Sequence, residues 1–253
     1  MAAISRDTIL SRATTPVVYV VLVLLWETSV RYLHVPTWIL PPPSLIVSTA
    51  VNWAPDLAYN SWITIEETVI GFVLGLILSL PLAVAIAFTV LLRRILYPIL
   101  LALQSVPKVA LAPLVILWLG IGTAPKIVIV VLVSFFPILV NVVAGLEAVP
   151  RQMLDLMHSL KAPESVIFRR LRVPFAMPYL FTGCKIAITF AVIGAVIGEF
   201  VAAQEGLGYT ILISTAQSLT PLAFAAIFLL TIISIVFFYI IEFAERRFVT
   251  WHL

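Results

Sequence analysis

The residues best placed to do chemistry in this sequence are polar side chains inside long apolar stretches. Lys108 lies between Pro107 and Pro113. Proline breaks a helix and frees carbonyl groups, and a charge at mid-bilayer costs at least about 2.5–3.5 kcal/mol. The sequence therefore places Gln104, Ser105 and Lys108 on a candidate polar pathway. The alternative is a lysine that is satisfied by carbonyls of the broken helix or by a carboxylate.

Four other ionisable residues lie near the ends of apolar stretches. Glu199 falls near the outer end of its stretch, where it either gates the pathway or meets headgroups and water. Lys185 lies about one and a half turns from the inner end of the same stretch, so we expect it to snorkel. Glu66 and Glu67 begin a long stretch and are expected to be solvated or helix-capping carboxylates. Of these four, only Glu199 joins the candidate pathway.

Patterns that support enzyme chemistry are missing from the sequence. It has no G-x-x-x-x-G-K-[ST] phosphate loop and no glycine followed by lysine. The three histidines lie in loops or at the terminus, and no set of His, Cys and carboxylates has ligand spacing. The three histidines are His34, His158 and His252. We therefore expect no catalytic residue, no metal site and no bound cofactor in this chain.

Composition indicates that the elements carrying these residues are membrane helices. Hydrophobic residues make up 62% of the 253 positions and charged residues 11%, whereas a soluble domain is about half apolar and a quarter charged. Six stretches approach the roughly 20 apolar residues that cross a bilayer. They run approximately Pro16–Tyr32, Ile63–Leu92, Ile95–Leu119, Ile127–Leu146, Tyr179–Ala203 and Pro221–Ile241. The first is expected to be a retained helix rather than a cleaved signal.

The distribution of basic residues predicts the orientation of these spans. If both termini are cytoplasmic, eleven of the fifteen Lys and Arg residues lie inside, and only Arg31 and Lys126 lie outside. Basic residues accumulate in short cytoplasmic loops. The same distribution explains the net charge of +3 without a nucleic-acid partner.

Two loops are longer than simple hairpins. The outer one contains Pro41-Pro42-Pro43, followed by Leu45, Ile46, Ala50 and Trp53, a spacing typical of an amphipathic interfacial segment. The inner loop, Glu147–Met177, contains an apolar stripe at helical spacing, formed by Met153, Leu154, Leu156, Met157 and Leu160. Pro163 and Glu164 then predict a second helix that ends before Pro174. An apolar stripe on a short cytoplasmic helix must pack against its own bundle or another chain.

Two G-x-x-x-G pairs, Gly71 with Gly75 and Gly194 with Gly198, predict close helix contacts. Packing within the chain is the default use of such a pair, ahead of a homodimer seam. The later sequence QEGLGYT is expected to shape a turn leading into a re-entrant or interfacial segment.

The inner-loop sequence DLMHSLKAPESVIFRRLRVPFAMP resembles the EAA loop of binding-protein-dependent ABC transporter permeases. Asp155 falls on the acidic position of that pattern, Leu171 and Val173 on its aliphatic positions, and Pro174 on its proline. The pattern's glycine is Lys161 in this chain, and Leu156-Met157 replace two small residues. Because glycine permits a positive φ that lysine tolerates poorly, either the turn is built differently or strain is accepted.

Other segments resemble the nitrate, sulfonate and taurine branch of these permeases. They are ALQSVPKVALAPLVILWLGIG, FFPILVNVVAGL and AVIGAVIGEFVAAQEGLGY, and the resemblance extends from about Pro41 to Arg247. It implies an all-α, six-span fold like that of type I importers, in a single transmembrane domain over residues 1–253. The coupling loop would lie at about 147–177. The coupling residues that it implies are Asp155, Leu156, Met157, Leu160, Lys161, Ala162, Pro163, Leu171 and Pro174.

The resemblance also implies partners and a location. Two copies of the permease would form the pathway in the bacterial inner membrane. Two cytoplasmic ATPase subunits would bind ATP and Mg, and a periplasmic or lipid-anchored binding protein would deliver a small polar solute. A sulfonate-, taurine- or nitrate-like anion is favoured by Lys108, and a heterocycle, vitamin precursor or aromatic carboxylate is the alternative. A secondary transporter is more remote, because the sequence has no inverted repeat and has a large inner helix pair. A membrane scaffold subunit is a further remote alternative.

Overall fold

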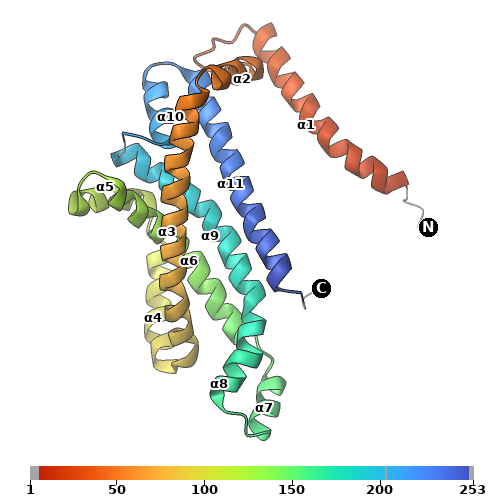
Figure 1. The fold of residues 1–253 in the computed structure, drawn as a ribbon, viewed down its shortest axis with the longest axis vertical. Helices are drawn as coiled ribbons and strands as arrows, with labels where there is room; N and C mark the ends of the chain where they lie inside the picture. The colour runs from red at the N-terminus through yellow and green to blue at the C-terminus, as the bar shows by residue number, and fades with distance from the viewer. Residues whose placement is uncertain (1–5, 203, 251–253) are drawn as a thin grey trace. The chain divides into compact units, whose positions relative to one another are not determined.

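The computed structural model describes residues 6–202 and 204–250, and every regular element in that part is a helix (Figure 1). Ala203 and His252, which figured in the sequence predictions, lie outside it. The helices are α1 (Arg6–Tyr32), α2 (Pro43–Asn52), α3 (Ala54–Phe88), α4 (Val90–Gln104), α5 (Lys108–Leu119), α6 (Thr123–Glu147), α7 (Arg151–Ser159), α8 (Glu164–Ile167), a π-helix (Phe168–Arg172), α9 (Val173–Ala202), α10 (Leu207–Ala216) and α11 (Thr220–Phe248).

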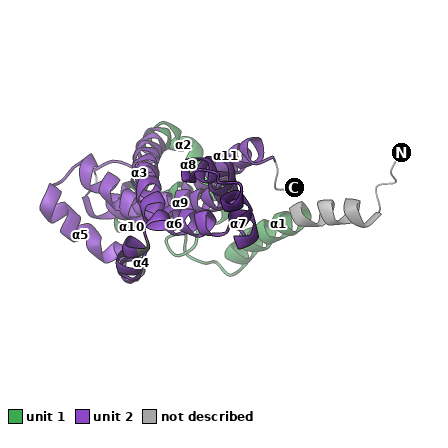
Figure 2. Ribbon diagram, turned by 90° about the horizontal axis from the view of Figure 1, so that it is seen from below, with its two compact units in different colours: residues 1–58, 210–228 green, residues 59–209, 229–253 purple. Residues whose placement is uncertain are grey.

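The chain divides into two compact units (Figure 2). Unit 1 comprises residues 1–58 and 210–228, and unit 2 comprises residues 59–209 and 229–253. The boundaries fall within α3, α10 and α11, so each of these helices contributes to both units. All of the candidate site residues belong to unit 2.

Within the described residues, four helical segments are long and apolar enough to cross a membrane: Ala54–Phe88, Thr123–Glu147, Glu164–Ala202 and Thr220–Phe248. Their positions confirm four of the predicted spans, with ends shifted by several residues. The span predicted over Ile95–Leu119 is not one straight helix, because α4 and α5 meet at an angle of 96°. Pro107 lacks an N–H, and its ring disfavours helical geometry at the preceding residue.

The first predicted span lies within α1, whose side chains are described only from Val17 onward. The structure therefore supplies four spans, or five with the bent pair. The sixth span and the side of the membrane on which the termini lie stay predictions.

Unit 2 is built around α6, which packs against α9 along most of its length. Ile129, Val130, Ile138 and Leu139 of α6 are buried there, as are the small side chains of α9 that face them. Glycines permit the close approach: a Cβ atom at Gly194 would lie 3.1 Å from the Cα of Val130. Both predicted G-x-x-x-G pairs contact α6, Gly71 and Gly75 from α3, and Gly194 and Gly198 from α9. They serve packing within the chain.

Helix α11 is joined to α9 by charge as well as by apolar packing. The Lys185 ammonium lies 2.5 Å from a carboxylate oxygen of Glu245, and the rings of Phe181 and Phe248 stack with centroids 6.5 Å apart. Lys185 was expected to snorkel to the membrane surface. It is instead paired with Glu245, a partner far along the sequence that spacing within one helix does not reveal.

In unit 1, polar contacts join α1 to α2. The Glu27 carboxylate accepts hydrogen bonds from the backbone N–H of Ser44 at 3.0 Å and from its hydroxyl at 2.8 Å. Glu27 therefore satisfies an N–H at the start of α2, a position where helix N–H groups have no internal partner. The interfacial segment predicted after Pro41-Pro42-Pro43 is this helix, with Ile46 buried and Val47 exposed.

Candidate functional site

The inner loop presents an apolar surface on α7. Met153, Leu156 and Leu160 are exposed, the last two at 60% and 69%, whereas Leu154 and Met157 are half-buried. The stripe predicted from the sequence is thus divided between a face directed toward the chain and a face directed away from it. Contiguous exposed apolar residues of this kind mark interaction surfaces.

Helix α7 ends in a Schellman turn with lysine at the left-handed position. The N–H of Ala162 donates to the carbonyl of Met157 at 3.0 Å, and the N–H of Lys161 donates to the carbonyl of His158 at 2.9 Å. Lys161 has φ of 54°, the conformation that glycine adopts without penalty. Of the two alternatives left by the sequence, the structure shows the second: the turn has the glycine geometry, and the lysine side chain is accommodated in it.

The loop after this turn is held to α7 and then to the bundle. Pro163 precedes the first turn of α8, and the imidazole of His158 lies 3.2 Å from the Glu164 carboxylate. Ile167 is completely buried. The predicted end of this helix before Pro174 is wrong, because α8, the π-helix and α9 form one continuous segment from Glu164 to Ala202. The wider π-turn lies directly before Pro174, where it accommodates a proline that lacks an N–H.

Arginine side chains anchor the base of the loop. The guanidinium of Arg172 donates to the carbonyl of Leu146 at 3.2 Å and lies 5.3 Å from the centre of the Phe88 ring. Arg93 pairs with Glu147 at 2.8 Å. Of the remaining predicted coupling residues, Asp155 and Pro163 are exposed, and Ala162, Leu171 and Pro174 are half-buried. The loop is thus fixed at its base and open at its tip.

The predicted pathway residues lie at the break between α4 and α5. Gln104 ends α4 and Lys108 begins α5. The Lys108 ammonium donates to the backbone carbonyl of Gln104 at 3.0 Å and lies 5.4 Å from the centre of the Phe136 ring. A carbonyl of the broken helix therefore satisfies one of its donors. Ser105 lies in the exposed connection between the two helices.

A cavity of about 290 Å³ opens beside this break. Its wall includes Gln104, Lys108, Val133, Phe136, Phe190 and Ile193, which come from α4, α5, α6 and α9. The structure thus brings two of the predicted pathway residues, Gln104 and Lys108, to one cavity. Glu199 and Ser105 are not among the residues that line it.

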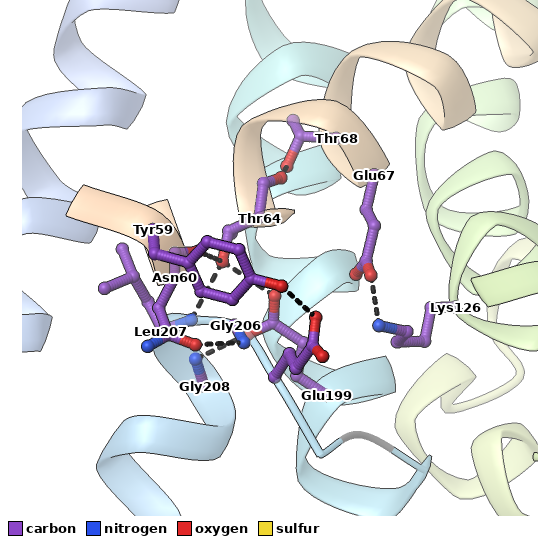
Figure 3. Close-up of polar contacts among 11 residues, drawn as sticks. Tyr59, Asn60, Thr64, Glu67, Thr68, Lys126, Glu199, Gly206, Leu207 and Gly208 are labelled. Carbon is purple, nitrogen blue, oxygen red and sulfur yellow. Dashed lines mark hydrogen bonds and ion pairs between the residues drawn. The ribbon is translucent and has the colours of Figure 1, made fainter. Parts of the chain in front are cut away.

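Glu199 belongs to a separate buried cluster (Figure 3). Its side chain is fully buried, accepting a hydrogen bond from the Thr64 hydroxyl at 2.7 Å and another from the N–H of Gly208. The Thr64 oxygen in turn accepts from the N–H of Leu207 at 2.9 Å. The N–H of Gly206 donates to the Asn60 side chain at 2.7 Å. Through these contacts α3 and α9 jointly hold the turn that begins α10.

A buried ion pair lies beside this cluster and was missed in the sequence. Glu67 of α3 and Lys126 of α6 are paired, and the Glu67 carboxylate is only 1% exposed. Glu67 was expected to be solvated, and that prediction is wrong. A signal was present: Thr64, Glu67, Thr68 and Gly71 recur at the spacing of one helix face, a polar and small-residue stripe that only a protein partner can satisfy.

Comparison with known proteins agrees with this geometry. The family described as "binding-protein-dependent transport system inner membrane component" matches residues 71–250. In the MetNI methionine ABC transporter, captured in an inward-facing conformation, one chain superposes with a TM-score of 0.63. That chain is 23% identical, and the match covers 75% of this chain and 92% of the other. At that identity the likeness concerns the fold alone.

Several relatives are similar over most of their length. The riboflavin transport system permease protein RibX of Chloroflexus aurantiacus is 37% identical, covering 93% of this chain and 89% of RibX. The formylaminopyrimidine transport permease protein ThiX of Halalkalibacterium halodurans is 35% identical, covering 92% and 93%. A putative aliphatic sulfonates permease of Bacillus subtilis, SsuC, is 27% identical, covering 91% and 84%. The chain thus belongs to the binding-protein-dependent inner membrane components, the multi-pass permease subunits of bacterial ABC importers.

Proposed function

We propose that two copies of this permease form the path by which a planar heterocyclic solute enters the cell, with two ATPase subunits docked on their inner loops. In such importers the ATPase is a separate subunit, and it would bind the ATP and Mg. A periplasmic or lipid-anchored binding protein would deliver the solute. The observation that carries the proposal is the exposed apolar face of α7, on a loop whose base is fixed to the bundle.

The choice of solute class is supported by the order of similarity among the relatives. Those that are 35–37% identical are named for riboflavin and for a formylaminopyrimidine. The relative named for aliphatic sulfonates is 27% identical. This order favours a heterocycle over the sulfonate-, taurine- or nitrate-like anion that Lys108 suggested in the sequence.

The docking role of the inner loop rests on how its residues are divided. Ile167 and Arg172 hold the loop to its own chain. Met153, Leu156 and Leu160 are left exposed on the opposite side. A few apolar side chains at the centre of an interface carry most of its binding energy. A cytoplasmic partner that covered α7 would bury all three.

The docking role is tested by Leu160→Asp, which places a charge in the proposed contact. We expect the variant to lose most of the ATPase during co-purification in detergent, because the charge would be buried without a partner. Ser165→Asp is the matched control, since it adds the same charge at an exposed position in the first turn of α8, where an acidic residue is favourable. If Leu160→Asp retained the ATPase and its stimulation by the loaded binding protein, the loop would not be the docking element.

The solute class has a separate test. The cognate binding protein, purified without added ligand, should retain its natural solute, which mass spectrometry of the denatured protein would identify. A pyrimidine, flavin or similar ring compound is expected. Recovery of taurine or an alkyl sulfonate would contradict the proposed class and leave the importer function intact.

A further inference from the structure

The cavity at the break between α4 and α5 combines ring, amide and ammonium groups in one place. Its volume of about 290 Å³ is close to the lower end of the range for small-molecule sites, about 300–1,000 Å³. A site of that size holds a single ring with its substituents. Mostly apolar walls with a few convergent polar groups are typical of such sites.

The two aromatic rings of the cavity are differently placed. Phe136 of α6 is buried, and the Lys108 ammonium lies over its ring. Phe190 of α9 is 46% exposed and lines the same cavity. Aromatic rings attract other rings in offset or edge-to-face arrangements. Phe190 therefore offers the surface on which a planar solute can stack.

The polar groups of the cavity favour a solute with oxygen acceptors. An ammonium has three donors, and Lys108 donates one hydrogen bond to the Gln104 carbonyl. No acidic side chain lines the cavity among the residues that the structure describes. A carbonyl or carboxylate oxygen of a solute would complete the coordination of the ammonium. A cationic group would be repelled by it.

We propose that this cavity is the site at which the permease itself binds its solute, with a planar ring stacked on Phe190 and a carbonyl or anionic oxygen bonded to Lys108. The inference rests on the proposed function and adds a specificity site to it. Taurine fits poorly, since it has no ring and carries an ammonium group of its own. The permease would thus select against small aliphatic zwitterions independently of the binding protein.

The direct test is protection of a cysteine in the cavity wall. Val109→Cys places a thiol at an exposed residue that lines the cavity. Leu117→Cys places one on the same helix outside the lining and serves as the matched control. The single native cysteine, Cys184, is buried and gives the background rate. Modification by N-ethylmaleimide would be timed in the purified permease–ATPase complex.

Three probes would be compared at saturating concentration: a formylaminopyrimidine, riboflavin and taurine. We expect at least one ring compound to slow modification at Val109→Cys, with no effect of any probe at Leu117→Cys and none of taurine at either position. If neither ring compound protected Val109→Cys, or if taurine protected it equally, the proposal would be overturned.

Two further variants separate ring stacking from general structure. Phe190→Leu should weaken protection by the ring compound about threefold to tenfold, the range for loss of one aromatic contact. Phe200→Leu should leave it unchanged, because Phe200 is similarly exposed on the same helix but does not line the cavity. Lys108→Met should weaken protection more than Lys108→Arg, which keeps the charge. Equal effects of the two Phe variants would contradict the stacking role.

The same preparations distinguish failure of this site from failure of the importer function. Stimulation of ATP hydrolysis by the loaded binding protein would be measured for each variant. Normal stimulation of ATP hydrolysis without protection of Val109→Cys by a ring compound would contradict the proposed site but not the importer function. Absent stimulation in the parent complex would instead contradict the proposed partnership.

Discussion

Lys161 adopts a left-handed backbone conformation, with φ of 54°, at the tip of the inner loop. For residues other than glycine this conformation costs roughly 1–2 kcal/mol. The turn that imposes this conformational cost also forms the two backbone hydrogen bonds that end α7. A residue in the glycine position of the family pattern is thus kept in the geometry that glycine would adopt.

Replacing this lysine tests the strain. Lys161→Gly should be tolerated and raise the melting temperature of the permease–ATPase complex slightly, because the penalty of roughly 1–2 kcal/mol for a Cβ in the left-handed conformation is removed and is only partly offset by the greater chain entropy of glycine. Lys161→Val should lower it, since a β-branched residue fits a positive φ worse than lysine. Lys161→Glu should weaken ATPase binding by reversing the charge, a prediction specific to the docking role. A lower melting temperature for Lys161→Gly than for Lys161→Val would contradict the account of strain.

Gly206 has a positive φ and lies against the Glu199 side chain. Gly122, the control residue, has a positive φ but no close neighbour. Both have positive φ, 110° and 150°. A Cβ atom at Gly206 would collide with the Glu199 carboxylate, whereas one at Gly122 would meet nothing within 4 Å. Gly206→Ala should therefore destabilise the protein by about 2 kcal/mol or more, and Gly122→Ala by less. Melting temperatures in detergent decide the point, and similar losses for the two variants would show that the clash is relieved by movement of Glu199.

At the scale of helices, the buried pair of Glu67 and Lys126 links α3 to α6. Removing one partner of such a pair leaves an uncompensated charge and typically costs about 3–5 kcal/mol. Replacing both with apolar residues can be nearly neutral. The pair therefore fixes which faces of the two helices meet, whatever its net contribution to stability.

A double-mutant cycle measures this link. Lys126→Met and Glu67→Leu should each lower the melting temperature strongly, and the double variant should recover much of the loss. Arg246→Met is the control, because the ion pair of Arg246 with Glu242 is exposed on α11, where such pairs are worth about 0–1 kcal/mol. Additive losses in the double variant would mean that the two side chains do not interact energetically.

Sequence alone predicted the long helices well, because runs of apolar residues admit few alternatives. The apolar stripe of α7 and the residues flanking its turn were likewise local patterns. The right-angle bend at Pro107, the continuation of α9 through Pro174 and the pairing of Glu67 depend on distant partners. Lys185 with Glu245 is the clearest case: the two residues are separated by most of α9, by α10 and by most of α11.

For the whole molecule, the main open prediction is the orientation in the membrane. The excess of basic residues on one side predicts that the inner loop lies in the cytoplasm and the turn before α6 outside. Thr123→Cys and Ser165→Cys put thiols at exposed positions that are predicted to lie on opposite sides. In intact cells, an impermeant thiol reagent should label the first and not the second, with lysed cells as the control for reactivity. Labelling of Ser165→Cys in intact cells would contradict the predicted orientation.

The π-helix between the inner loop and α9 makes this turn tolerant of a change in length. A π-turn accommodates one residue more than an α-helical turn. Deleting one residue from Phe168–Arg172 would return the turn to α-helical bonding, and the helices on its two sides would keep nearly the same facing. A deletion in a regular α-helical part of α9 would instead rotate everything before it by about 100° around the helix axis. The proposed docking face of α7 would then point away from its partner, although no contact residue had changed. Within the segment Glu164–Ala202, single-residue insertions and deletions during divergence should therefore be confined to this turn.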